Sequence, residues 1–412
     1  MSRFLRVVPQ CLVNCQCQKF SFLFFQLPMM ESQESPVPGV TTETKTTTTA
    51  TTTAATKPSC HIPMMKPFRH MLKSIAKEHQ LELITKSHGW INIFRDTRSN
   101  HDCVLYGTAF PLNGQSSSRL AADKTATSII LDLHNVPHIP HLLATNPHMI
   151  YSGFKNSNRA IVGTWPGLIA MLEKYSIVVL KPKSGSMGRS TYKVENQLQL
   201  EQAWMVLLEK ARDFCISPFV EIEHEYRCIF LDDEMHICFR KNVPCVVGDG
   251  TSSVAKLISN YEQIVHKKMT LSNEIQSKLN QILLKDEKLV LDWCHNLSRG
   301  SRADKVISKE LYTQLKELGG RTMKALGLRF SSVDIVKLKE TATSKDSNFV
   351  IPENRLLVLE VNGSVSVGGY VTQHPEDFEM AQKMFSNAVH LFFEEQKLRE
   401  RMKLEMVMVA KN

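Results

Sequence analysis

The chain lacks the two best-known nucleotide-binding loops, since no stretch matches GxxxxGK[ST] and none matches GxGxxG. Beyond residue 30 it also has no apolar run long enough to cross a bilayer, so no membrane span is expected. The net charge of +9 is spread along the 412 residues instead of being clustered. This pattern argues against a nucleic-acid-binding surface, and it suits an anionic small substrate equally well.

The cysteines do not form a recognisable metal or disulfide pattern. Four of the ten fall in apolar, strand-like stretches, where a free thiol packs as a small hydrophobic group. Three more, Cys11, Cys15 and Cys17, lack a second ligand pair at zinc spacing. A reducing compartment is therefore expected, with the cytoplasm as the simplest location.

The first 60 residues read as a leader and a tether. Residues 1–30 contain Arg3, Arg6 and Lys19 and no acid, which is compatible with a transit peptide, a secretory signal or a disordered tail. A transit peptide would direct the chain to a mitochondrion or plastid. The segment 41–56, TTETKTTTTATTTAAT, is of low complexity and cannot bury a core.

The remaining sequence predicts a mixed α/β (α+β) fold with hairpins. We expect a small N-terminal α/β region at 61–117, a main domain at 118–395 and a charged tail at 396–412. Helices are expected at 68–86, 118–135, 195–213, 308–326 and 376–395, and after the GDGTSS turn with Ser252 or Ser253 as N-cap. Strands are expected at 89–94, 103–110, 178–181, 219–231, 235–241, 332–338 and 355–362.

Two predicted strands carry the residues of a candidate metal site. Asp334 lies in SSVDIV, and Glu360 and Asn362 lie in LEVNGS. Residues i and i+2 of a strand point to the same face, so Glu360 and Asn362 should project together. Two carboxylates and an amide oxygen suit one or two Mg²⁺ ions, with Mn²⁺ as an alternative. The competing interpretation is that Glu360 pairs with an arginine.

A second candidate is the polar loop in VVLKPKSGSMGRS, which follows a strand at Lys181. Gly185 and Gly188 allow backbone N–H groups to approach an anion, and Lys181 and Lys183 add positive charge. A lysine at the end of a strand is commonly an ordinary surface residue. The same holds for Lys124, which lies on a predicted helix in LAADKTATSIILDLHNVPHIP.

In colinear order, these segments resemble the ATP-grasp ligases, especially cyanophycin synthetase, the bifunctional glutathione synthetases and D-alanine–D-alanine ligase. The resemblance runs with gaps from about Arg119 to Val389. It implies two α+β subdomains that clasp ATP, with Lys124 and Lys181 as the two ATP lysines. The other nucleotide residues that it implies are Lys183, Ser184, Gly185, Ser186, Met187, Gly188, Phe219, Val220, Glu221, Glu225, Arg240 and Lys241.

Within this resemblance each segment has an expected role. In PFVEIEHEYRCIFLDDEM, Phe219 and Val220 would offer backbone groups to adenine, and Glu225 would take the ribose hydroxyls. In RKNVPCVVGDGTSSVAKLI, Arg240 or Lys241 would touch phosphates. The loop NLSRG, which begins at Asn296, would lie near the reacting carbonyl, with Arg299 or Arg302 supplying a catalytic positive charge. Asp334, Glu360 and Asn362 would hold Mg²⁺.

The resemblance implies an ATP-dependent carboxylate–amine (or thiol) ligase, a carbon–nitrogen ligase that forms ADP through an acyl phosphate. Its substrates would be small amino-acid-like or peptide-like carboxylates and amines, and their identities stay open. So does the oligomeric state, with a homodimer as one option. Departures such as Ser301, in place of the second glycine of the Asn loop, fall mostly on the substrate side. An ATP-grasp phosphotransferase and a non-catalytic ATP-binding protein are the alternatives.

Overall fold

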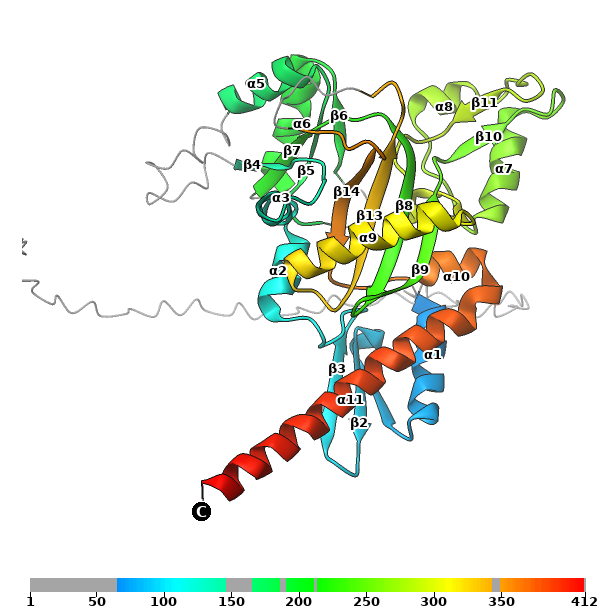
Figure 1. Ribbon diagram of the computed structural model, residues 1–412. Helices are drawn as coiled ribbons and strands as arrows, with labels where there is room; N and C mark the ends of the chain where they lie inside the picture. The colour runs from blue at the N-terminus through cyan, green and yellow to red at the C-terminus, as the bar shows by residue number, and fades with distance from the viewer. Residues whose placement is uncertain (1–64, 146–164, 186–189, 211–212, 343–348, 411–412) are drawn as a thin grey trace, which may run out of the picture. The chain divides into compact units, whose positions relative to one another are not determined.

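The computed structural model of the protein describes residues 65–145, 165–185, 190–210, 213–342 and 349–410 (Figure 1). All of them belong to one compact unit, Cys60–Asn412. The predicted leader and the Thr-rich tether lie outside the described residues. No helix in the described ranges is both long enough and apolar enough to span a bilayer.

The largest sheet in the described residues is antiparallel and has five strands in the order β12-β9-β8-β13-β14. Its strands are β8 (Ile222–Leu231), β9 (Glu234–Lys241), β12 (Ala303–Lys305), β13 (Phe330–Leu338) and β14 (Leu356–Asn362). Helix α9 (Lys309–Leu326) lies across one face of this sheet (Figure 1). Side chains from β8, β13 and α9 form a shared apolar core there, which includes Phe230, Val333, Ile335 and Leu315.

Local capping residues set both ends of helix α9. The Ser308 side chain caps its N-terminus by accepting from the N–H of Leu311, and Gly327 ends it with a left-handed φ of 63°. In the middle of the helix, Gly319 lets the ring of Phe230 approach the backbone. A Cβ atom at this position would lie 2.5 Å from two carbons of that ring.

A second antiparallel sheet has four strands in the order β4-β7-β5-β6. Its strands are β4 (Leu142–Thr145), β5 (Val178–Pro182), β6 (Tyr192–Val194) and β7 (Asp213–Pro218). Helices α5 (Trp165–Tyr175) and α6 (Gln197–Lys210) cover one face, where Val178, Leu180, Phe214 and Ile216 are fully buried. The alternate residues, among them Lys181 and Cys215, face away from this core.

Helices α2 (Gln115–Ala122) and α3 (Lys124–Leu133) contact strand β14. Helix α3 also contacts β4. The break between the two helices falls at Asp123, whose extended backbone and side chain cap α3 through the N–H groups of Thr125 and Ala126. This cap places Lys124 in the first turn of α3.

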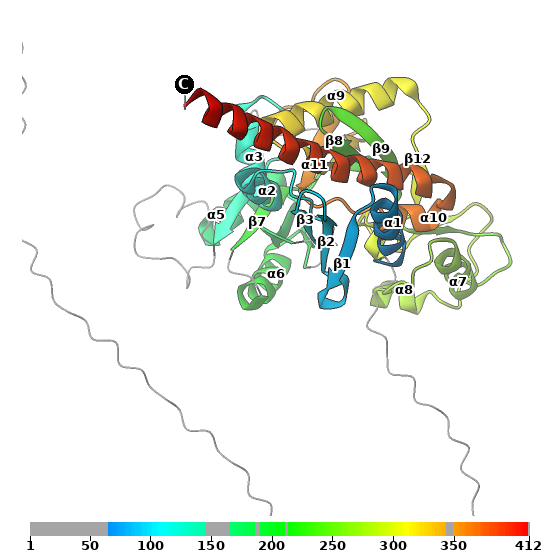
Figure 2. The same ribbon diagram turned by 90° about the horizontal axis from the view of Figure 1, so that it is seen from below.

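The N-terminal region consists of α1 (Met65–Glu78) and the sheet β1 (Glu82–Lys86), β2 (Ile91–Asp96) and β3 (His101–Tyr106). It packs with α10 (Gly368–Gln373) and α11 (Phe378–Val409) against the five-stranded sheet, and Figure 2 shows α11 passing over α1 and β3. The helix predicted at 376–395 is confirmed as part of α11, on which Ala381, Phe385 and Ala388 are fully buried. Residues 400–409 of this helix are exposed.

A smaller cluster surrounds α7 (Val254–Ile264), α8 (Asn273–Ser277), β10 (Cys245–Val247) and β11 (Lys288–Val290). Ser253 caps α7 by accepting from the N–H of Lys256, as one of the two predicted caps. This cluster touches the loop at 296–300, because the Tyr261 hydroxyl donates to the Gly300 carbonyl at 2.9 Å.

The expected mixed α/β fold with antiparallel hairpins is confirmed, but several predicted boundaries are wrong. The helix predicted at 68–86 stops at Glu78, and its last residues form β1 after Gln80 adopts a positive φ of 56°. The helix predicted at 118–135 is two helices, and the one predicted at 195–213 ends before β7. The six cysteines described are all free thiols.

Candidate functional site

One face of the five-stranded sheet carries charged residues where an apolar core would be usual. Strand alternation and register place Glu225, Arg227, Lys241, Asp334 and Glu360 on this face, opposite to the face covered by α9. We call these five residues the ionic face. Along the strands, the ionic face is flanked at both ends by apolar residues that point the same way and belong to two separate core clusters.

Asp334 is held by two cations. The Arg227 guanidinium donates from Nε to Oδ1 and from Nη2 to Oδ2, both at 2.8 Å, and the Lys241 ammonium lies 3.0 Å from Oδ2. Burial by itself would raise the pKa of Asp334, but the positive charges of Arg227 and Lys241 outweigh it and hold the pKa well below the usual value. Asp334 is therefore ionised although it is buried.

Lys241 also forms an ion pair with Glu225, and both residues are buried. Burial raises the pKa of Glu225, and the charge of Lys241 opposes that rise. One ammonium therefore bridges the carboxylates of Glu225 and Asp334. A cation that binds these two carboxylates would therefore have to displace the Lys241 ammonium group.

The two predicted ATP lysines reach the ionic face from different elements. Lys124 in α3 lies 3.2 Å from Oε1 of Glu360. Lys181 in β5 is also buried, and among the described residues it has no ion-pair partner within 4.0 Å. Burial lowers the pKa of Lys181, and the nearby charges of Glu360 and Glu225 partly offset this effect. Lys181 thus presents an ammonium group that lacks a close counter-ion in the described part of the chain.

The loop after Lys181 is described only in part. Lys183 pairs with Asp123 at 3.3 Å and with Asp213 at 3.2 Å, so its charge is already engaged. Burial opposes its charged form, but the two acids raise its pKa overall. Ser184 and Gly185 are exposed. The predicted phosphate contacts at Ser186, Met187 and Gly188 lie outside the described residues.

The predicted metal ligands share one face. Asp334 and Glu360 are directly opposite each other across β13 and β14, and Asn362 lies two residues further along β14. The Nδ2 of Asn362 is buried and has no hydrogen-bond partner in the described ranges. No group of three acidic, cysteine or histidine side chains there could hold a metal. With two carboxylates and one amide, the donor set still fits a hard cation, provided that Lys241 and Lys124 yield to it.

In the segment Phe219–Glu221, which was predicted to bind adenine, some polar groups already form hydrogen bonds within the protein. The N–H of Phe219 donates to the Ile177 carbonyl at 3.0 Å, so its carbonyl is what remains for a ligand. The Val220 side chain packs in an apolar cluster. Glu221 is exposed, and its carboxylate accepts from the Thr341 hydroxyl at 3.0 Å.

Arg240 and Arg302 lie apart from the ionic face. Arg240 alternates with Lys241 on β9, so it points to the opposite face, where it binds Asp304 at 2.8 Å. Arg302 binds the same carboxylate at 3.0 Å. Of the two predicted phosphate residues in this segment, the geometry thus brings only Lys241 to the site.

The Asn296 loop is a short 3₁₀ turn, η4 (Leu297–Arg299). The side-chain amide oxygen of Asn296 accepts a hydrogen bond from the N–H of Ser298 and so caps the turn. Arg299 pairs with the nearly buried Asp292 at 2.6 Å. Gly300 has a φ of 98°, and a Cβ there would collide with the Met269 sulfur.

Arg227 is a site residue that no sequence motif singles out. Its only signal is its position two residues after Glu225, which places both on one face of β8. Its bidentate bond to Asp334 depends on strand register, which a single sequence does not specify. Cys215, next to Lys181 across β5 and β7, was likewise not singled out as a site residue.

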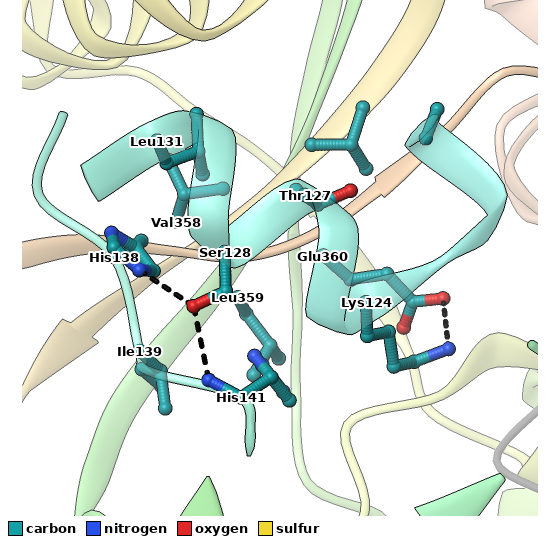
Figure 3. A pocket seen from close by; sticks show the side chains of 12 residues that line it. Lys124, Thr127, Ser128, Leu131, His138, Ile139, His141, Val358, Leu359 and Glu360 are labelled. Atoms are coloured by element: carbon teal, nitrogen blue, oxygen red, sulfur yellow. Dashed lines mark hydrogen bonds and ion pairs between the residues drawn. The ribbon is translucent and has the colours of Figure 1, made fainter. Parts of the chain in front are cut away.

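A pocket opens beside Lys124 and Glu360 (Figure 3). Two histidines that follow α3 line it, together with Ser128 of the helix. The Ser128 hydroxyl lies 2.8 Å from His138 Nε2 and accepts from the backbone N–H of His141 at 3.1 Å. These three residues were also not predicted as site residues.

No family model matches this sequence, and no curated protein matches it. Solved structures do. A bifunctional glutathione synthetase from Pasteurella multocida is 17% identical over 75% of this chain, with a TM-score of 0.45. The match covers 44% of the synthetase, so this chain spans less than half of its length.

A D-alanine–D-alanine ligase from Bacillus anthracis is 12% identical, with 69% of this chain and 72% of the ligase covered and a TM-score of 0.42. D-cycloserine synthetase DcsG is 15% identical, with 65% and 70% covered and a TM-score of 0.38. All three TM-scores lie below 0.5. The likeness therefore identifies neither an activity nor a substrate for this chain.

Proposed function

We propose that this protein is an ATP-grasp ligase that uses ATP to activate a carboxylate and joins it to an amine or a thiol. In this reaction the carboxylate attacks the γ-phosphorus, the bond from that phosphorus to the bridging oxygen of ADP breaks, and an acyl phosphate forms. The amine or thiol then attacks the acyl carbon and displaces phosphate. ADP and phosphate are the co-products.

The observation that carries the proposal is the convergence of charges from separate segments. Lys124 of α3 contacts Glu360 of β14, Lys181 of β5 lies near both, and Lys241 of β9 bridges Glu225 and Asp334. Ion pairs within the site compensate most of the cost of burying these charges, but Lys181 has no close counter-ion in the described part of the chain, and a bound anion would supply one. Three ammonium groups next to hard oxygen donors favour a nucleoside triphosphate with a divalent cation as the ligand.

Mg²⁺ is the metal that this set of oxygens suits, and Asp334, Glu360 and Asn362 would hold it. When bound, it would neutralise charge on the transferring phosphoryl group. The chain's own part is positioning. Arg227 fixes the Asp334 carboxylate through two parallel bonds, so this carboxylate keeps its orientation and charge when Lys241 turns to a phosphate.

In the proposed complex, Lys181 and Lys124 bind phosphate oxygens and stabilise the charge that develops during transfer. Glu225 accepts from the ribose hydroxyls once Lys241 has left it. The loop that begins at Ser184 covers the phosphates and limits hydrolysis of the acyl phosphate by water. Arg299 or Asn296 orients the reacting carbonyl.

The test is release of ADP and phosphate across a panel of carboxylates and amines, with mass spectrometry of any product. We expect Glu360→Gln to lower the rate about 100-fold or more, because it removes a carboxylate that would hold Mg²⁺ at the transferring phosphoryl group. Asp334→Asn should do the same. Asp304→Asn is the matched control, since Asp304 binds Arg240 on the opposite face of the sheet.

Three results would contradict the proposal. ADP release at the wild-type rate by both Glu360→Gln and Asp334→Asn rejects the assignment of the site. A stable phosphorylated product without free phosphate identifies a phosphotransferase instead. Nucleotide binding without turnover on any substrate of the panel identifies a binding protein.

A further inference from the structure

Cys228 and Cys238 are the one pair of described cysteines whose sulfur atoms are in contact. They are directly opposite each other across strands β8 and β9, and their Sγ atoms lie 3.7 Å apart. At this distance one thiol can donate a weak hydrogen bond to the other. The other cysteines that the structure describes are also free thiols, and none of them has a sulfur neighbour within hydrogen-bond reach there.

The backbone geometry of this pair suits a disulfide. Residues directly opposite each other on antiparallel strands have Cα atoms about 4.5 or 5.5 Å apart. A disulfide joins cysteines whose Cα atoms are about 4.4–6.8 Å apart, and it brings the two sulfur atoms to about 2 Å. Bond formation therefore requires a local movement of the two side chains and no change in strand pairing.

The two thiols differ in access to solvent. Cys228 is fully buried in the apolar core that β8 shares with helix α9, whereas Cys238 is half-buried at the edge of that core. Burial raises the pKa of the Cys228 thiol well above its usual value. An oxidant that arrives from solvent therefore meets Cys238 first, and Cys228 is placed to react with the product.

We propose that Cys228 and Cys238 are a site of reversible disulfide formation, with a peroxide as the oxidant. The Cys238 thiolate attacks one oxygen of hydrogen peroxide, the O–O bond breaks, and the departing oxygen takes up a proton and leaves as water. The Cys228 sulfur then attacks the sulfenic acid at Cys238, forms the S–S bond and displaces hydroxide, which takes the Cys228 proton. Two thiols and one peroxide thus give one disulfide and two waters, and the peroxide oxygens gain the two electrons that the sulfur atoms lose.

The disulfide joins two strands that carry much of the ionic face. Glu225 and Lys241 are directly opposite each other on the same two strands, three positions from the cysteines. A covalent bond between Cys228 and Cys238 fixes the register that holds this ion pair together. Because Cys228 follows Arg227 on the strand, it points to the α9 side, so the bond forms on the face opposite to the charges. A cellular thiol such as glutathione can restore the free pair in a reducing compartment.

The experiment treats the folded full chain with hydrogen peroxide and maps its cysteines by mass spectrometry. Cys228 and Cys238 lie in one tryptic peptide, because no lysine or arginine occurs between Arg227 and Arg240. Thiols that remain free are blocked with N-ethylmaleimide in urea before digestion without reductant. We expect this peptide to appear two hydrogen atoms lighter than its dithiol form and without maleimide. Treatment with dithiothreitol before blocking should restore a peptide that carries two maleimides.

Single replacements test the pairing. Cys238→Ala removes the thiol that reacts first, so Cys228 should keep its maleimide label after peroxide treatment. In Cys228→Ala the disulfide cannot form, and dimedone should trap the sulfenic acid at Cys238. Cys245→Ala is the matched control, because Cys245 is also half-buried but has no sulfur neighbour in the described part of the chain. This variant should form the disulfide as the wild-type protein does.

Three results would overturn this assignment. Full maleimide labelling of both cysteines, at a peroxide concentration that oxidises other cysteines of the chain, shows that the two thiols are only packed together. A disulfide from Cys238 to a different cysteine shows that the contact does not direct the reaction. A sulfenic acid at Cys238 that persists in the wild-type protein shows that Cys228 does not react with it. None of these results bears on the proposed function, because disulfide formation needs no nucleotide.

Discussion

Replacing Lys181 with methionine should stabilise the nucleotide-free protein and abolish nucleotide binding. Lys181 is buried, and no acid among the described residues lies within 4.0 Å of its ammonium group. Its lowered pKa, caused first by burial, means that the folded state disfavours the charged form. A binding residue of this kind costs stability until its ligand is present.

The size of the effect follows from two opposing contributions. Burying one ammonium costs several kcal/mol after relaxation, on the order of 3 kcal/mol. The nearby carboxylates of Glu360 and Glu225 return part of this cost. Methionine keeps an apolar stem of similar length and has no charge to desolvate. We expect the free energy of unfolding to rise by about 1–2 kcal/mol.

The pH dependence gives a second signature. Between the lowered pKa of Lys181 and the usual value of 10.5, the unfolded chain binds more protons at this residue than the folded protein does. The contribution of Lys181 to the free energy of unfolding therefore rises with pH across that window. Lys181→Met should lack this rise.

Urea denaturation of the nucleotide-free protein, followed by circular dichroism, measures both effects. Lys183→Met is the matched control, because Lys183 binds Asp123 and Asp213 and its loss should destabilise the fold by about 1 kcal/mol. The reasoning is refuted if Lys181→Met is as destabilising as Lys183→Met. Such a result would mean that the Lys181 ammonium is net stabilising without a ligand.

Two further predictions concern the framework. Arg227→Met and Asp334→Asn should each destabilise the protein by about 3 kcal/mol, because the pair bonds through two 2.8 Å contacts and the Asp334 carboxylate is buried. A double-mutant cycle in urea should give a coupling of about 2 kcal/mol, and additive effects would show that the pair is not coupled. Gly319→Ala should lower the free energy of unfolding by about 1–3 kcal/mol, since its Cβ would meet Phe230 at 2.5 Å. Gly320→Ala, with nothing within 4 Å of its Cβ, should raise the free energy of unfolding by about 1 kcal/mol. Melting temperatures that shift in the same direction for both variants would contradict this packing.

Long periodic segments could be predicted from the sequence, whereas short ones could not. The helices expected at 376–395 and 308–326 depend on local spacing and capping, and α11 and α9 begin within two residues of those positions. Strand β1 and the break at Asp123 were missed. In both places a single residue with a non-helical backbone interrupts an otherwise helical pattern. The strands β10, β11 and β12, of three residues each, have no periodicity to detect.

By itself, the sequence determined which side chains share a face within the strands and helices that it predicted correctly, since side-chain direction follows from the two-residue and 3.6-residue periods. This was enough to place Glu360 beside Asn362 and Lys124 in a helical turn. Only the tertiary structure decided which strands are neighbours, and therefore that Arg227 binds Asp334 and that Lys241 bridges two acids. Register and burial depend on contacts between distant segments, and no local pattern encodes them.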